Sequence, residues 1–322
     1  MPRTDLTLDE LRAYRSSAAN PADFDEFWAG TLDEARAAGG PVSLVRADSP
    51  VSELVVEDLT FPGFGGEPIR GWVIRPRDTT PTATVVQYIG YGGGRGLAHE
   101  HLHWAASGFA HIVMDTRGQG SGWGTGGDTP DPHGSGPAFP GFMTRGIQSR
   151  DTYYYRRVFT DAVRLIDAVR ELDFVDADAI AVTGGSQGGA ISLAVAGLVP
   201  GLLAVMPDVP FLCDFRRSVE LTPDAPFTEL RQYLAVHRDI VDETFATLSY
   251  FDGVNFARRA TAAARFSVAL MDPIVLPSTV FAAFNDYAGS DREIDVYPYN
   301  GHEGGQGHPW ITQARWLADR AH

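Results

Sequence analysis

Short apolar runs alternate along the chain with segments of helical periodicity, and this alternation restricts the fold more than any other feature. Most of the runs are continuously apolar rather than alternating, which is typical of strands buried on both faces of a sheet. They occupy residues 83–89, 110–114, 179–183, 202–206, 266–271 and 293–297. Helices are predicted at 97–107, 152–172, 187–198, 277–287 and 308–320. We therefore expect an α/β fold with a mostly parallel central sheet and helices on both faces.

The region before this alternation has a different pattern. Residues 1–50 are predicted to be mostly helical, because Phe24, Phe27 and Trp28 recur at helical spacing. Two strands then follow, at 54–59 and 69–74, with paired glycines between them that favour a hairpin-like turn. We interpret the helical part as a segment packed on the main domain.

Two long segments interrupt the alternation. Residues 118–150 carry many glycines and prolines without periodicity, and such long loops in compact domains are usually functional or disordered. Residues 210–263 hold helical patches between two predicted strands, and we interpret them as a helical cap over the carboxyl edge of the sheet. The chain is expected to form a single domain over residues 1–322 with this cap as an insertion.

The composition excludes several classes of function. Hydrophobic residues make up 44 % of the chain, which is enough for a sizeable core and argues against a disordered protein. The formal net charge is −15, so binding to nucleic acid or to an anionic membrane is not expected. The sequence contains no lysine, which excludes a catalytic lysine, a Schiff base and a Walker-type phosphate site.

The single cysteine and the start of the sequence favour a reducing compartment. Cys213 has no second cysteine to pair with, so no intrachain disulfide is possible and a buried free thiol is expected. The first ten residues lack the apolar stretch of a signal peptide. We expect a cytoplasmic location.

The pattern G-x-S-x-G occupies residues 184–188, with Ser186 at its centre. A predicted strand precedes it and an apolar helix follows, which is the strand–turn–helix setting of a nucleophile elbow. The glycines suit such a turn, because a side chain on either outer glycine would clash. Ser186 would then stand at a helix N-terminus, where developing negative charge is favoured. The alternative interpretation is a glycine-rich turn with a capping serine.

Candidates for a base and its orienting acid follow in the chain order of α/β hydrolases, Ser, then Asp or Glu, then His. His302 lies in a glycine-rich loop after the last predicted strand, and Asp272 follows the strand before that one. Both should lie at the carboxyl edge of the sheet, beside Ser186. His308 is a rival base at a predicted helix start, and Asp295 is a rival acid inside a strand. We predict the triad Ser186, Asp272 and His302.

An acyl-transfer site also needs hydrogen-bond donors for the oxyanion. The backbone N–H of Gln187, the residue after the nucleophile, is one candidate. The second is the N–H of Tyr91 in the glycine-rich loop at residues 90–94. A plain glycine turn carrying a surface aromatic residue is the alternative.

A metal site is the competing constellation. His99 and His103 would share one face of a helix, as paired zinc ligands do. No carboxylate motif or cysteine pair completes the set, so we favour histidines at a helix start. No metal or cofactor is expected.

Several motifs occur together and in order along nearly the whole chain. They are Asp115-Thr116-Arg117-Gly118-Gln119-Gly120, Gly184-Gly185-Ser186-Gln187-Gly188 and Gly301-His302-Glu303, accompanied by Phe24–Trp28, Tyr153–Arg157 and Pro277–Thr279. With these motifs the chain resembles carbohydrate esterase family seven, the acetyl xylan esterases and cephalosporin C deacetylases of the α/β-hydrolase superfamily.

The resemblance implies a fold, a site and an assembly. It implies the triad and oxyanion donors named above, namely Ser186, Asp272, His302, Tyr91 and Gln187. Arg117 and Gln119 are expected to brace the loops around the site, with an arginine fork near a catalytic carboxylate. The family is typically a homohexamer that admits only small acetylated substrates. The chain departs from the family in residues 89–93, which lack its usual histidine and asparagine, and in residues 273–277, which lack its usual cysteine.

The sequence therefore predicts a serine esterase that deacetylates short acetylated sugars, with cephalosporin C as a second expected substrate. Two alternatives stay open at this point. One is a serine peptidase or thioesterase on the same fold, because the fold does not set the substrate. The other is a non-catalytic binding protein of hydrolase fold.

Overall fold

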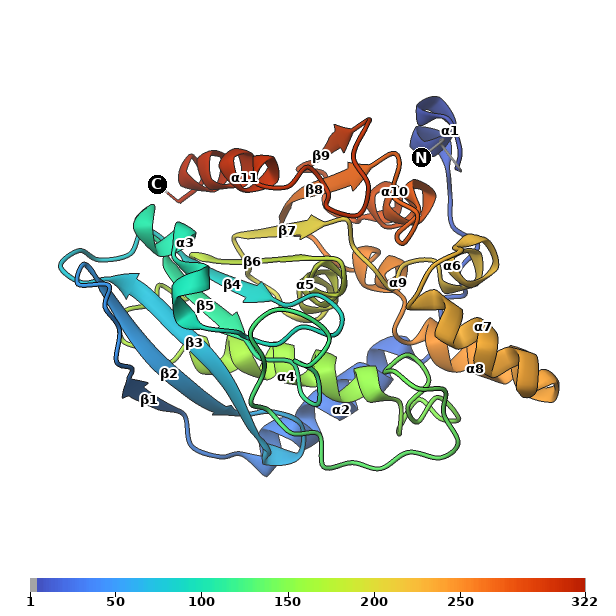
Figure 1. The fold of residues 1–322 in the computed structure, drawn as a ribbon, viewed down its shortest axis with the longest axis horizontal. Helices are drawn as coiled ribbons and strands as arrows, with labels where there is room; N and C mark the ends of the chain where they lie inside the picture. The colour runs from blue at the N-terminus through green and yellow to red at the C-terminus, as the bar shows by residue number, and fades with distance from the viewer. Residues whose placement is uncertain (1–4, 322) are drawn as a thin grey trace.

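The computed structural model describes residues 5–321, and within them the chain forms a nine-stranded sheet covered by helices (Figure 1). The order of the strands across the sheet is β1-β2-β3-β5-β4-β6-β7-β8-β9. Their bounds are β1 Ser43–Arg46, β2 Leu54–Pro62, β3 Pro68–Pro76, β4 Thr84–Tyr88, β5 Ala110–Met114, β6 Ile180–Gly185, β7 Ala204–Asp208, β8 Ala263–Ala269 and β9 Arg292–Tyr297.

The direction of the strands divides the sheet into two parts. Strands β1, β2, β3 and β5 pair antiparallel, whereas β5, β4, β6, β7, β8 and β9 are parallel. The six apolar runs are the six parallel strands, and the α/β fold with a mostly parallel sheet is confirmed. Strands β2 and β3 form the expected hairpin around the short 3-10 helix η1, Phe64–Gly66.

Helices cover both faces of the sheet. The α-helices are α1 Leu8–Ala13, α2 Phe24–Ala38, α3 His103–Ala106, α4 Tyr154–Val169, α5 Gln187–Leu198, α6 Phe215–Leu221, α7 Phe227–Val236, α8 Val241–Ser249, α9 Gly253–Ala257, α10 Pro277–Asp286 and α11 His308–Ala318, with 3-10 helices η2 Ala98–His101 and η3 Arg238–Ile240. Alternate residues of a strand serve opposite faces. Val86 packs in the core beneath α4 and α5, whereas its neighbour Val85 packs with Trp104 and Trp316 on the side of α3 and α11.

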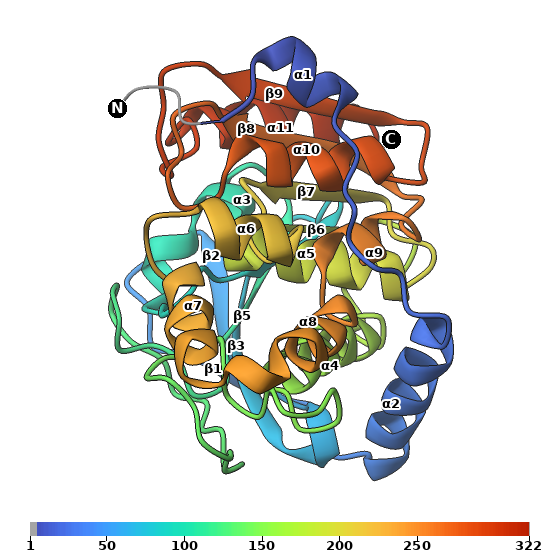
Figure 2. The ribbon, with the colours of Figure 1, turned by 90° about the vertical axis from the view of Figure 1, so that its right-hand side faces the viewer.

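Helices α6, α7 and α8 gather on the side toward which the parallel strands point (Figures 1 and 2). They come from the segment that we interpreted as a cap, 210–263. Its last helix, α9, differs from that interpretation, because it packs tightly on the core helix α5. A Cβ on Gly197 of α5 would lie 2.6 Å from the carbonyl oxygen of Phe256. Only close packing of the two helices leaves so little space.

Two further local predictions were incomplete. Strand β1 lies inside the first 50 residues, which we expected to be mostly helical, and its four residues are mostly exposed, so they carry little apolar signal. The helix predicted at 97–107 is instead η2 followed by α3, with Leu102 between them. No helix within residues 5–321 is long and apolar enough to span a membrane.

The N-terminal segment runs across the outside of the domain and contacts parts of the chain that come much later (Figure 2). Asn285 of α10 donates through Nδ2 to the carbonyl oxygens of Leu11 and Tyr14, at 2.9 and 2.8 Å. The indole N–H of Trp28, on α2, donates to the carbonyl oxygen of Tyr250 at 3.0 Å. Helices α1 and α2 are therefore fastened to the late part of the domain.

Candidate active site

Ser186 lies on a sharp turn between β6 and α5. Its φ of 55° is in the left-handed region, which is strained for a residue with a side chain and is typical of a nucleophile elbow. The turn fits only because its neighbours are glycines. A Cβ on Gly184 would lie 2.5 Å from the carbonyl carbon of Gly188, and a Cβ on Gly188 would lie 2.1 Å from the carbonyl oxygen of Tyr88. Glycine at both positions therefore allows Ser186 to stand above the sheet edge.

A continuous hydrogen-bonded chain joins the three predicted residues of the triad. His302 Nε2 lies 3.0 Å from Ser186 Oγ, and His302 Nδ1 lies 2.8 Å from Asp272 Oδ2. The three residues come from three separate loops, after β6, β8 and β9. With Nδ1 protonated toward the carboxylate, Nε2 is left as the acceptor for the Ser186 hydroxyl proton. The structure thus brings together what the sequence predicted.

The carboxylate of Asp272 is fully buried and rigidly held. Its Oδ1 accepts hydrogen bonds from the backbone N–H groups of Ile274 and Val275, at 2.8 and 2.9 Å, while Oδ2 faces the imidazole. The rival residues lie elsewhere. Asp295 forms a bidentate ion pair with Arg265 inside the sheet, and His308 begins α11.

The two predicted oxyanion donors are near Ser186, and their backbone N–H groups are available to a ligand. Within residues 5–321 neither the N–H of Tyr91 nor that of Gln187 donates to another protein group. The N–H of Ser186 itself donates to the carbonyl oxygen of Asp208 at 2.9 Å, so it does not compete for the same role. This pattern fits a hole built from the Tyr91 and Gln187 amides.

Gln119 connects the two backbone segments that carry the predicted oxyanion donors. Its Oε1 accepts from the N–H of Gly92 at 2.6 Å, and its Nε2 donates to the side-chain Oε1 of Gln187 at 2.9 Å and to the hydroxyl of Tyr154 at 3.1 Å. The side chain therefore holds the residue after Tyr91 against the first residue of α5. This contact agrees with the bracing position that the resemblance implied.

Arg117 is fully buried but braces a different part of the molecule from the one expected. Its guanidinium forms a bidentate pair with Asp161 of α4, at 2.6 and 2.7 Å, and contacts Glu67 at 2.5 Å. The expected fork near a catalytic carboxylate is wrong, since these partners are structural. Arg117 instead fixes the start of the 118–150 loop to α4 and to the β2–β3 hairpin.

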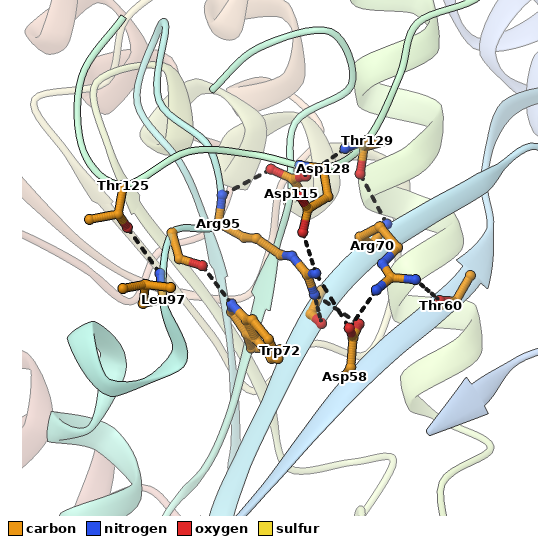
Figure 3. A network of polar contacts seen from close by, with 12 residues as sticks. Asp58, Thr60, Arg70, Trp72, Arg95, Leu97, Asp115, Thr125, Asp128 and Thr129 are labelled. Atoms are coloured by element: carbon orange, nitrogen blue, oxygen red, sulfur yellow. Dashed lines mark hydrogen bonds and ion pairs between the residues drawn. The ribbon is translucent and has the colours of Figure 1, made fainter. Parts of the chain in front are cut away.

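A second network, centred on the buried Asp115 and Arg95, was missed by sequence reasoning and holds two loops together (Figure 3). Asp115 accepts through Oδ1 from the N–H of Arg95 at 2.9 Å and through Oδ2 from the N–H groups of Asp128 and Thr129, at 2.6 and 2.9 Å. The Arg95 guanidinium in turn pairs with Asp58 and Asp128, at 2.9 and 2.6 Å. The loop after β4 and the long loop 118–150 are thereby fixed to each other and to β2.

The side chain of Tyr91 reaches away from Ser186 and toward the cap. Its hydroxyl donates to Glu229 Oε1 of α7 at 2.6 Å and accepts from the N–H of Phe142 at 2.6 Å. Burial, together with the charge of Glu229, raises the pKa of this hydroxyl, and burial also raises the pKa of Glu229. One residue thus joins the loop after β4, the long loop and the cap.

Trp123 of the long loop forms a wall of the space around Ser186. The residue is 55 % exposed, and its indole N–H donates to the carbonyl oxygen of Tyr91 at 2.7 Å. Two hollows of about 340 Å³ each meet at Ser186, His302 and Trp123. One is mainly apolar and is bounded by Ala225, Pro226 and Ile274; the other is bounded by polar residues, among them Asp208, Glu303 and Gln306.

The competing metal constellation is not assembled in the part of the chain that the structure describes. His99 and His103 lie on η2 and α3 and not on one helix. No group of three or more His, Cys, Asp or Glu side chains in residues 5–321 is arranged to hold a metal ion. Cys213 is buried, as expected for a free thiol in the core.

Comparisons with known proteins agree with this geometry. The sequence matches the family acetyl xylan esterase (AXE1) over residues 1–320. The structure of an acetyl xylan esterase from Paenibacillus sp. R4 is 36 % identical, with a TM-score of 0.90 over 98 % of this chain and 100 % of that one. Acetyl xylan esterase 1 from Thermoanaerobacterium sp. JW/SL YS485 is 32 % identical, with a TM-score of 0.90 over 98 % of this chain and 99 % of that one.

A curated relative is longer than this chain. Acetyl esterase Axe7A from Xylanibacter ruminicola is 28 % identical over 88 % of this chain, and the match spans 64 % of the relative's length. The family match covers nearly every residue, and the two solved acetyl xylan esterases share the whole fold. The chain therefore belongs to the acetyl xylan esterase family, a family of carboxylic ester hydrolases with the α/β-hydrolase fold.

Proposed function

We propose that this protein is a serine esterase that removes acetyl groups from short acetylated xylo-oligosaccharides. The observation that carries the proposal is the hydrogen-bonded chain from Ser186 through His302 to the buried Asp272. A serine beside a neutral imidazole, oriented by a carboxylate, is the arrangement that acyl transfer requires. The names of the similar proteins support acetyl as the acyl group and xylan as its source.

In the first half of the reaction, Ser186 Oγ attacks the carbonyl carbon of the ester and His302 Nε2 takes the hydroxyl proton. The carbonyl oxygen becomes an anion and accepts hydrogen bonds from the amides of Tyr91 and Gln187. Asp272 stabilises the imidazolium that forms. The bond to the sugar oxygen then breaks, His302 returns the proton to that oxygen, and the acetyl group stays on Ser186.

In the second half, a water molecule attacks the acetyl-enzyme while His302 accepts one of its protons. The tetrahedral intermediate uses the same two amides, and its collapse releases acetate and restores the Ser186 hydroxyl. The mainly apolar hollow beside Ala225, Pro226 and Ile274 suits the acetyl methyl group. No step requires a redox change or a metal.

The test is hydrolysis of p-nitrophenyl esters of increasing acyl length. Wild-type protein should turn over the acetate faster than the butyrate, and Ser186→Ala should abolish turnover. Ser290→Ala is the matched control, because Ser290 is exposed and lies in the turn before β9, away from the site. Full activity of Ser186→Ala would refute the mechanism, and faster turnover of longer chains would refute the acetyl assignment alone.

The same assays separate the two alternatives. Faster cleavage of peptides or thioesters than of acetyl esters would favour a peptidase or thioesterase. A serine-reactive phosphonate should label Ser186, as mass spectrometry would reveal. Failure to label the folded protein would instead favour a non-catalytic binding protein.

Three further expectations belong to this proposal. Cephalosporin C carries an acetyl ester and is proposed as a second substrate, tested by acetate release. A homohexamer is proposed from the family resemblance, and analytical ultracentrifugation would measure its mass. A cytoplasmic location is proposed from the composition, and fractionation of the source cells would test it.

A further inference from the structure

A larger cavity, of about 560 Å³, adjoins the polar hollow beside Ser186. The two share a wall made by Trp123, Gly185 and Asp208, so the cavity leads away from the nucleophile on its polar side. Helix α11 also lines the cavity, through Trp310 and Gln313. The cavity lies within the size range of about 300–1,000 Å³ that is usual for small-ligand sites.

The indole of Trp123 lies against glycine backbone on one side. A Cβ on Gly93 would be 2.4 Å from the indole ring, and a Cβ on Gly90 would be 3.3 Å from it. Any larger residue at Gly93 would displace the ring. The glycines thus let the indole lie close to the loop, while Trp123 as a residue stays more than half exposed and lines both cavities. An exposed aromatic surface fixed in this way can stack on the C–H face of a sugar ring.

Planar polar groups line the same cavity. Gln313 Nε2 donates to Asp208 Oδ1 at 2.9 Å, and Gln87 Oε1 is paired with His111 Nε2 at 2.9 Å. These contacts hold the carboxylate and the carboxamides in fixed orientations, and the other end of the Gln87 amide is left as a donor. Fixed groups with several donor and acceptor positions are suited to neighbouring hydroxyl groups.

From this arrangement we propose that the cavity binds the neutral sugar residues next to the acetylated one. A pyranose ring stacks on Trp123, and the Asp208–Gln313 pair and Gln87 bind its hydroxyl groups. The inference rests on the proposed function, since it assigns the alcohol part of the same ester. It makes Trp123 and Gln313 specificity-determining residues for oligosaccharides over simple acetyl esters.

The test compares acetylated xylotriose with p-nitrophenyl acetate, which has no sugar. Relative to wild type, Gln313→Ala should lower the ratio of kcat/KM for the two substrates about tenfold, because each lost hydrogen bond weakens only the sugar complex. Trp123→Phe keeps an aromatic face and should lower the ratio less than Trp123→Ala does. Gln232→Ala is the matched control, on the exposed face of α7.

Binding of the unacetylated product gives a second measurement that does not depend on turnover. Xylotriose should change the tryptophan fluorescence of Ser186→Ala protein, and the additional change Trp123→Phe should remove most of that signal. A fluorescence signal that Trp123→Phe leaves intact would refute the stacking position. An unchanged substrate ratio in folded Gln313→Ala protein would refute the sugar site. Absence of p-nitrophenyl acetate hydrolysis by the wild-type protein would instead refute the esterase proposal.

Discussion

The side chain of Gln119 offers the sharpest test of how the oxyanion donors are positioned. Gln119→Ala removes the acceptor of the Gly92 N–H, which lies 2.6 Å away. The other partners keep contacts, because Tyr154 donates to the carbonyl oxygen of Arg117 and Gln187 Oε1 accepts from Tyr155. One orphaned donor should therefore lower the free energy of unfolding by about 1–3 kcal/mol.

The effect on catalysis follows from the position of the freed loop. Loss of a whole oxyanion donor costs about 2.7–4 kcal/mol of transition-state stabilisation. Because Gln119→Ala displaces the Tyr91 N–H without deleting it, we expect a cost of about 1–3 kcal/mol, which is about 5- to 150-fold in kcat. KM should change little, since the ground-state ester makes weaker hydrogen bonds to the hole.

The assay is steady-state hydrolysis of p-nitrophenyl acetate, with urea unfolding of the same preparations. Gln232→Ala serves again as the control, because its side chain is exposed and lines neither hollow beside Ser186. A fall in stability with kcat unchanged would show that Gln119 only supports the fold. A rise in KM with kcat unchanged would place its effect on substrate binding.

Three more predictions concern buried charges. Asp272→Asn should lower kcat by about 10⁴-fold with the fold intact, because the imidazole would take the wrong tautomer; circular dichroism alongside the ester assay checks both parts. Arg117→Met should destabilise the protein by about 3–5 kcal/mol in urea unfolding, since it leaves the buried carboxylate of Asp161 without its charged partner. Burial raises the pKa of Asp208 to about 6, above its ordinary value of 3.8. The folded state then binds more protons than the unfolded state between these values, so stability should fall as the pH rises through this window, and Asp208→Asn should flatten that fall in thermal melts.

The sequence was most informative where local chemistry and burial agree. Strands β4, β5, β6 and β7 are buried on both faces, so their apolar runs are easily recognised, and helix α5 begins and ends where it was predicted. The nucleophile, base and acid could be placed because each follows a strand and their order along the chain is diagnostic. Strand β1 could not be predicted, because its residues are largely exposed and give no apolar pattern.

Contacts between distant side chains were beyond sequence reasoning. Nothing local indicates that Arg117 pairs with Asp161, since the two residues meet only after α4 has packed on the sheet. The tie between Tyr91 and Glu229 of the cap is of the same kind. Asp115 is the first residue of the motif Asp115–Gly120 and directly follows β5. This position was the available signal for its role in joining two loops.

The N-terminal segment has a consequence for how the chain is made. Trp28 is buried against Tyr250, which comes 222 positions later, and Leu11 is held by Asn285, which comes 274 positions later. At about 5–20 residues per second, a ribosome needs about 10 to 45 seconds to supply the partner of Trp28. During that interval α2 can pack on η1 and α4, where Trp28 meets Phe159, but it lacks its later partners around Tyr250. The N-terminal segment can therefore complete its docking only after the last third of the chain has been synthesised.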